Sequence, residues 1–175
     1  MRRRCLLDPR TNTLGVSTDL PLRVVIYICE EVRRQGHDLA AEGDGVIRVA
    51  GMAEAWEMAI GAYNLADQPP SIEMIRRMGA SIESCNQRGF RTHPITLGGR
   101  PHGTHATLIQ CQMEELLADW THLDGWTVYR KYEAIHPFAD GNGRSGKILA
   151  AWRDGTLLDP IFPPNNFWGR PIQNP

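Results

Sequence analysis

The chain has 175 residues, a length typical of one domain that buries a sizeable hydrophobic core. Hydrophobic residues make up 42% of it and charged residues 22%, which excludes a disordered, collagen-like or coiled-coil chain. The formal net charge of -1 lacks the positive excess of proteins that wrap duplex nucleic acid, so we expect no nucleic-acid partner.

The N-terminal segment, the apolar runs and the cysteines favour a cytoplasmic location. A basic start is followed at once by Asp8 and Pro9, which end the apolar run that a signal peptide needs. The longest apolar run, Val24 to Cys29, is far shorter than the roughly 20 residues that span a bilayer, so we expect no membrane partner. No C-x-x-C pair indicates a zinc or redox site, and we expect reduced, mostly buried cysteines at Cys5, Cys29, Cys85 and Cys111.

Hydrophobic spacing predicts a first helix over about residues 19–35. Thr18 and Asp19 offer an N-cap, and Pro21 suits the first turn. Gly36 then follows the last position of the apolar stripe, where a helix commonly ends.

Two more apolar stripes with helical spacing follow. The first runs from Met52 to Tyr63 and the second from Ile72 to Cys85, and they are separated by a break at Asp67 to Ser71. Before them, residues 37–50 are polar and carry glycines. Within that stretch, Val46 to Val49 is too short to distinguish a strand from the start of a helix.

A β-hairpin is expected next. Phe90 to Leu97 favours a strand, and Gly98 to Gly103 supplies turn residues. We call the segment from Arg91 to Gly103 the flap. His102 and His105 lie three residues apart, but no third ligand is near them in the sequence, so we expect no metal site there.

Two amphipathic helices are expected after the flap. One covers about residues 107–120, and the other places Val128, Tyr129, Tyr132 and Ile135 on one face. The last segment, residues 159–175, is rich in proline and cannot form a helix. Its aromatic residues suggest that it packs over the body of the protein.

Most of the candidate catalytic and ligand-binding residues lie in one stretch, HPFADGNGRSGK, from His136 to Lys147. It leaves an apolar helix, turns through Asp-Gly-Asn-Gly and enters a new helix, whose first N–H groups would form an anion-binding concavity. Asp140 is a hard ligand for Mg²⁺, while Arg144 and Lys147 share a helix face and can both meet phosphate oxygens. His136 is able to take a proton near neutral pH. These residues predict a phosphate site, with a simple turn and a capping histidine as the alternative.

The segment from His136 to Arg144, HPFADGNGR, resembles the signature of the Fic family (the Fic/Doc superfamily), His-x-Phe-x-Asp/Glu-Gly-Asn-Gly/Lys-Arg, at every specified position. The resemblance covers about residues 50–157 of what we expect to be a single domain, 1–175. It implies a mainly α fold, a Fic-type helical bundle with a small β-hairpin flap. It also implies a protein adenylyltransferase, an enzyme that transfers AMP from ATP to a Ser, Thr or Tyr hydroxyl of a target protein.

The resemblance also implies roles for individual residues. His136 would be the general base, Asp140 would hold Mg²⁺ against the phosphates, and a buried Phe138 would anchor the loop. The catalytic group would comprise His136, Asn142 and Arg144; the phosphates would meet Gly141, Asn142, Gly143, Arg144 and Lys147. The flap would receive an extended target segment by strand addition, through Thr92, His93, Pro94, Ile95, Thr96 and Leu97.

The chain departs from the family pattern at Lys147, where many members carry a second arginine. Lysine keeps the positive charge but loses the bidentate fork. Many members also carry an inhibitory Ser/Thr-x-x-x-Glu-Gly/Asn helix whose glutamate pairs with that arginine, and this chain has no such motif. Self-inhibition of that type is therefore expected to be absent, and a separate inhibitor or antitoxin is left open.

Two alternatives to adenylyl transfer stay open. One is a Doc-like protein kinase, in which the nucleotide is inverted and a phosphoryl group moves; Gly141 and Gly143 point away from that subgroup, whereas Lys147 keeps it open. The other is a non-catalytic, Fic-shaped module that binds nucleotide or a partner. His136 argues against the second alternative, because a binding module has no use for a base.

Overall fold

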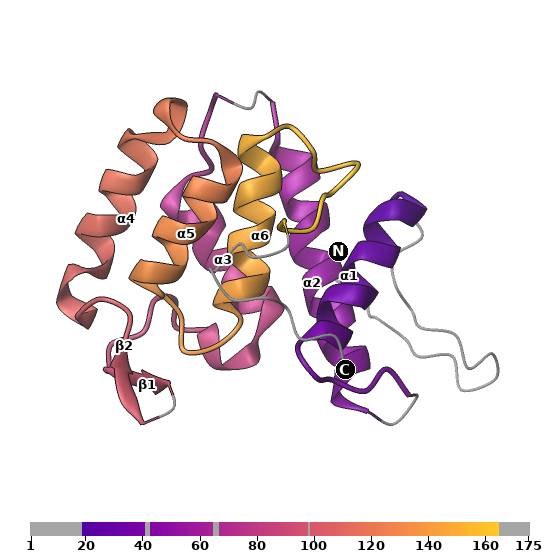
Figure 1. Cartoon of the computed structure of the whole chain (residues 1–175), viewed down its shortest axis with the longest axis horizontal. Coiled ribbons are helices and arrows are strands. Elements are labelled where there is room, and N and C mark those ends of the chain that lie inside the picture. Colours follow the sequence, from indigo (N-terminus) through magenta and orange to yellow (C-terminus); the bar gives the residue numbers. More distant parts are fainter. Residues whose placement is uncertain (1–18, 41–42, 65–66, 98, 165–175) are drawn as a thin grey trace.

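The computed structural model describes residues 19–40, 43–64, 67–97 and 99–164, and within these ranges the chain is mainly helical (Figure 1). The helices are α1 (Leu22–Arg34), α2 (Asp44–Ala62), α3 (Ile72–Ile82), α4 (Ile109–Ala118), α5 (Gly125–Ile135) and α6 (Asn142–Arg153). Two strands, β1 (Ile95–Leu97) and β2 (Arg100–His102), form an antiparallel hairpin. Three short 3-10 turns also lie within the described ranges: η1 (Ser84–Asn86), η2 (Ala106–Leu108) and η3 (Trp120–His122). The predicted mainly helical fold with a small hairpin is confirmed.

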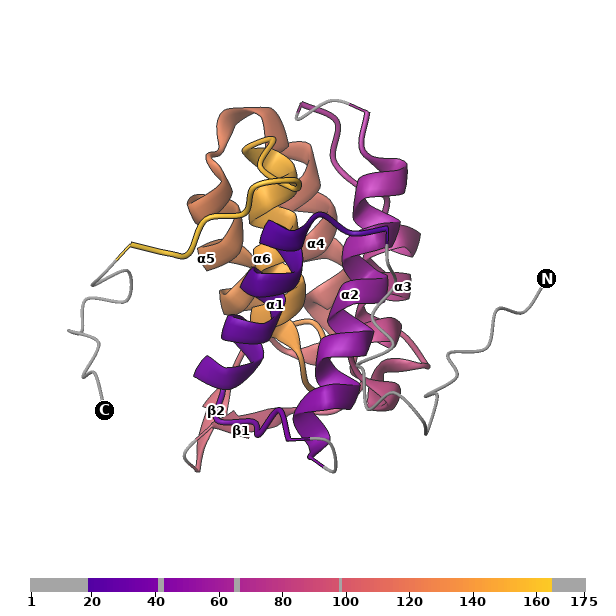
Figure 2. The same ribbon diagram turned by 90° about the vertical axis from the view of Figure 1, so that its right-hand side faces the viewer.

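Helix α6 lies inside the bundle and contacts α5, α2 and α3 (Figures 1 and 2). Small residues allow this close packing. A Cβ atom at Gly146 would lie 2.8 Å from the Tyr129 ring and 2.9 Å from the Tyr132 ring, closer than real Cβ contacts. Helix α1 packs on α2, and α4 packs on α5. The start of α6 is therefore held by helices from both halves of the chain.

The flap lies at the end of the bundle where α5 ends and α6 begins (Figure 1). Its register pairs Ile95 with His102, and no more than three residues of each strand take part. Arg91 fixes the base of the flap, because its guanidinium donates to the carbonyls of His136 (2.7 Å) and Thr104 (2.6 Å). The predicted hairpin thus sits beside the loop that carries the Fic-like motif.

Two helix starts differ from the sequence prediction. The N-cap of α1 is Pro21, without a side-chain cap, rather than Thr18 or Asp19; Thr18 itself lies outside the described residues. Helix α2 begins at Asp44 instead of Met52 and so includes Val46 to Val49. An ion pair one turn into α2, between Asp44 Oδ2 and Arg48 Nε at 3.2 Å, supports this early start.

The prediction of mostly buried cysteines is wrong for the residues described. Cys85 and Cys111 are exposed and Cys29 is half-buried, all three as free thiols, whereas Cys5 lies outside the described ranges. Helix α3 ends at Ile82 because Glu83 is extended (φ -141°), which moves Cys85 off the apolar stripe and into η1.

The proline-rich segment packs on α1 as far as it is described. The Phe162 ring stacks on Tyr27 with centroids 4.4 Å apart, and the Arg34 guanidinium lies 4.0 Å from the centroid of the same ring. Residues 165–175 of this segment lie outside the described residues. None of the helices in the described part of the chain has the length and apolarity needed to cross a lipid bilayer.

Candidate active site

Two left-handed residues shape the loop between α5 and α6. His136 (φ 51°) ends α5, and Gly141 (φ 78°) is the N-cap of α6. Asn142 closes the loop, because its Oδ1 accepts from Phe138 N at 2.8 Å and its Nδ2 donates to Phe138 O at 3.0 Å. The Asn142 side chain is therefore engaged in holding the loop, and its backbone is what faces a ligand.

Phe138 anchors the loop in the core. Its ring is fully buried and lies 5.4 Å, centroid to centroid, from Phe90. A Cβ atom at Gly79 of α3 would come within 2.2 Å of the Phe138 ring, so only glycine fits beneath it. The expectation that Phe138 is a buried anchor is confirmed.

A cavity of about 460 Å³ opens at the start of α6. It is lined by the loop, the flap and the end of α1: Gln35, Ile95, Thr96, His102, His136, Ala139, Asp140, Gly141, Asn142 and Gly143. The backbone N–H groups of Asn142 and Gly143 have no hydrogen-bond acceptor among the described residues. Free N–H groups at a helix N-terminus attract anions. The cavity thus brings together His136, Asp140, an anion site and three flap residues.

His136 is neutral and half-buried at the side of this cavity. Burial, and second the neighbouring His102, lower the pKa of His136 to about 4. Its Nδ1 lies 3.1 Å from Nε2 of His102 and 3.6 Å from Oε2 of Glu133. Its Nε2 has no hydrogen-bond partner within the described residues, which leaves one ring nitrogen available to a ligand.

The structure places Arg144 elsewhere than the sequence suggests. Its side chain is only 1% exposed and pairs with Glu83, while its Nη1 donates to Ile82 O at 3.5 Å. Arg144 Nη2 also lies 3.9 Å from Asp140 Oδ1. The guanidinium therefore supports the loop from beneath and does not line the cavity.

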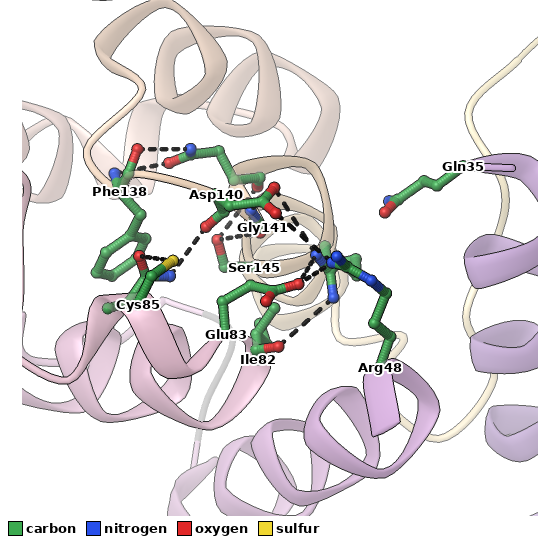
Figure 3. A network of polar contacts seen from close by, with 12 residues as sticks. Gln35, Arg48, Ile82, Glu83, Cys85, Phe138, Asp140, Gly141 and Ser145 are labelled. Atoms are coloured by element: carbon green, nitrogen blue, oxygen red, sulfur yellow. Dashed lines mark hydrogen bonds and ion pairs between the residues drawn. The ribbon is translucent and has the colours of Figure 1, made fainter. Parts of the chain in front are cut away.

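Glu83 joins Arg144 to a second arginine, Arg48 of α2, and Figure 3 shows Arg48 and Glu83 converging below Asp140. Arg48 Nη1 lies 3.5 Å from Asp140 Oδ2. Asn86 holds the same loop from η1, because its Nδ2 donates to Asp140 O at 2.9 Å. The two guanidinium groups of Arg48 and Arg144 thus face the two carboxylates of Glu83 and Asp140 at the start of the turn.

Lys147 also has a protein partner in this structure. Its ammonium group pairs with Glu31 of α1, a carboxylate that is 2% exposed and accepts from Gln35 Nε2 at 2.8 Å. Arg144 and Lys147 therefore pair with carboxylates from different parts of the chain, Glu83 after α3 and Glu31 of α1, and the predicted shared phosphate-binding face is not formed in this state. The inhibitory sequence motif is absent, but Glu31 of α1 does form an ion pair with Lys147.

The flap residues expected to dock a target lie near the cavity. Ile95 and Thr96 line it, and Ile95 is half-buried. Thr92, His93 and Pro94 precede β1 and are exposed, and Leu97 ends the strand. The first part of the flap is thus accessible from outside.

Asp140 fits the role of a ligand for Mg²⁺ that arrives with a nucleotide. Its side chain is 56% exposed and Asp140 lines the cavity, with Oδ1 accepting from Gly141 N at 2.6 Å. Mg²⁺ is usually held by one or two carboxylates together with substrate phosphates and water. No group of three metal-binding side chains gathers in the described ranges.

Several residues of the site are missing from the sequence prediction. Glu133 has a usable signal, since it lies three residues before His136 on one helix and so on the same face. The position of His102 beside His136 can be predicted only once the register of the hairpin is known. Glu31, Arg48 and Glu83 carry no local signal, because each meets its partner at the site through contacts between segments far apart in the sequence.

The helical bundle with its small hairpin has a Fic-like fold. Among solved structures, the chain is similar to a Fic-domain-containing signaling protein from Bacteroides thetaiotaomicron, with a TM-score of 0.56 and 17% sequence identity. The match covers 74% of this chain and 61% of that chain, and at this identity it establishes the fold alone. No protein-family model and no curated protein matches the sequence.

Proposed function

We propose that the protein belongs to the Fic family and is a protein adenylyltransferase, which transfers AMP from ATP to a Ser, Thr or Tyr hydroxyl of a target protein. The observation that carries the proposal is the cavity at the start of α6, where a neutral His136, unpaired N–H groups and Asp140 converge beside the flap. A base, an anion site and a metal ligand within one cavity are what transfer from a nucleotide to a hydroxyl requires.

The proposed reaction begins with the target lying along the flap, where main-chain hydrogen bonds would align its hydroxyl. Nε2 of His136 accepts the hydroxyl proton while the oxygen attacks the α-phosphorus. The bond from the α-phosphorus to the bridging oxygen of the β-phosphate breaks, and pyrophosphate leaves. The N–H groups of Asn142 and Gly143 stabilise the charge that develops on the α-phosphate. When bound, Mg²⁺ held by Asp140 would supply charge neutralisation for the β-phosphate.

Labelled ATP tests this function against its alternatives. The protein is incubated with a cell lysate and with ATP labelled in either the α- or the γ-phosphate. Adenylyl transfer places α-label on protein and no γ-label. A γ-label on protein would instead support Doc-like kinase chemistry, and no label of either kind would favour a binding module.

Asp140→Ala is expected to weaken activity and its Mg²⁺ dependence together. Without this carboxylate the metal loses its protein anchor, and the Mg²⁺ concentration for half-maximal transfer should rise by at least about tenfold. A matched control is Asp119→Ala, which removes an exposed carboxylate paired with Lys131, away from the cavity. An unchanged Mg²⁺ titration in Asp140→Ala would refute the metal role.

Glu31→Gln is expected to tighten ATP binding by roughly tenfold. Lys147 can meet the outer phosphates only if it leaves Glu31, and that would strand a carboxylate that is 2% exposed. Glutamine removes this penalty and frees the ammonium group. Calorimetry on the parent, Glu31→Gln and the double variant Glu31→Gln/Lys147→Ala measures the affinity. The gain should disappear in the double variant; equal ATP affinity in all three proteins would show that Lys147 makes no phosphate contact.

A further inference from the structure

Glu133 lies between the catalytic histidine and the anion site, and the proposed reaction gives it no role. It stands on the last turn of α5, three residues before His136, with a side chain that is 16% exposed. Its Oε2 lies 3.6 Å from His136 Nδ1. Its Oε1 is buried, has no hydrogen-bond partner among the described residues, and lies on the side that faces Gly143. An underused buried carboxylate next to a base calls for an explanation.

A hydrogen bond between His102 and His136 needs one proton between the two ring nitrogens. Which of the two nitrogens carries this proton decides whether His136 can act as a base. The two ring nitrogens are 3.1 Å apart, so one of them must donate. If His136 Nδ1 carries the proton and donates to His102, then His136 Nε2 keeps its lone pair. If His102 Nε2 donates instead, a neutral His136 carries its proton on Nε2 and cannot accept another there. The two arrangements have the same hydrogen bond and opposite reactivity.

We propose that Glu133 is a positioning residue, which selects the tautomer of His136 with the proton on Nδ1 and the lone pair on Nε2. This inference rests on the proposed function, in which His136 Nε2 takes the hydroxyl proton. An ionised carboxylate only accepts hydrogen bonds, so at this distance Glu133 attracts an N–H on Nδ1 and repels a lone pair there. The same charge stabilises the imidazolium that forms when Nε2 is protonated.

The surroundings of Glu133 make this selection dependent on pH. Burial raises the pKa of Glu133 to about 7, with Lys147 of α6 lowering it and Glu31 of α1 raising it. On the other side lie His136 and, beyond it, His102 of the flap, and Tyr129 and Tyr132 of α5 itself also interact with the Glu133 charge. A carboxylate with this pKa is ionised only above neutral pH. Transfer should therefore rise as pH increases through about 7.

The tautomer can be measured in the resting protein by nitrogen NMR, with ¹⁵N-labelled histidine and at a pH above the pKa of Glu133. The parent should show a protonated Nδ1 and an unprotonated Nε2 on His136, whose signals are assigned by their loss in His136→Gln. Glu133→Gln should shift His136 toward the ordinary Nε2-protonated form. Glu57→Gln is the matched control, since Glu57 Oε1 is likewise buried without a partner but belongs to α2. A parent with the proton on Nε2, or a Glu133→Gln spectrum equal to the parent's, would overturn the proposal.

The pH profile of transfer gives a second readout. Glu133→Gln should lower the rate at alkaline pH by about tenfold or more and move the acid limb from about 7 toward the His136 pKa of about 4. Glu57→Gln should keep both the rate and the limb. A limb that stays near 7 in Glu133→Gln contradicts the proposal. If no transfer is found for any protein, the adenylyltransferase function fails, and the NMR measurement still decides the role of Glu133.

Discussion

His136→Ala is expected to lower AMP transfer by about 100-fold or more while ATP affinity stays within about twofold of the parent. His136 offers a free Nε2 at the cavity, and its other ring nitrogen contacts His102 rather than the anion site. The change therefore removes the base and leaves the N–H groups at the start of α6 in place. Single-turnover kinetics with labelled ATP measures the first effect, and calorimetry measures the second.

His105→Ala is the control for this change. His105 lies just beyond the flap, but its Nδ1 contacts Thr107 Oγ1 at 2.9 Å and not the cavity. Its loss should leave the transfer rate unchanged. Transfer at the parental rate in His136→Ala would remove His136 from the mechanism, and an equal loss in both variants would point to damage of the flap instead.

Phe138→Ala is expected to reduce the free energy of unfolding by about 3–5 kcal/mol. The ring is fully buried, and the space between Gly79 and Phe90 would be left empty. The loop should also lose its fixed shape, because Asn142 bonds both backbone groups of Phe138. Urea denaturation followed by circular dichroism measures the change in stability.

Phe90→Ala serves as the comparison for Phe138→Ala. Phe90 is half-buried and contacts the outer side of the same ring, so its removal should cost clearly less. Equal losses of stability in the two variants would mean that Phe138 contributes no more to the stability of the protein than the half-buried Phe90 does.

Features set by local sequence were predictable. The turn before α6 follows from the Asp-Gly-Asn-Gly sequence from Asp140 to Gly143, and the hairpin follows from a β-favouring run before Gly98 and Gly99. The stripes of α3 and α5 follow from helical spacing, as the buried Ile75, Met78, Val128 and Tyr132 show.

Features that depend on packing between distant helices were not predictable. Arg144 meets Glu83, which is 61 residues away in sequence, and Lys147 meets Glu31, which is 116 residues away. Motif spacing places both cations beside a phosphate site, but it does not predict the carboxylates that pair with them, Glu31 of α1 and Glu83 just after α3. The start of α2 at Asp44 depends instead on the loop just before it, because Gly45 N donates to Asp38 O at 3.1 Å and a Cβ at Gly45 would lie 2.1 Å from that oxygen.

The identity of the released product tests the central claim most directly. Transfer of AMP breaks the bond between the α- and β-phosphates and releases pyrophosphate, in an amount equal to the AMP found on the target protein. Transfer of a phosphoryl group releases ADP. We expect pyrophosphate, dependent on Mg²⁺ and on His136, to match the modified hydroxyl groups one for one. Release of ADP matched by phosphate on protein would contradict the proposed adenylyltransferase function.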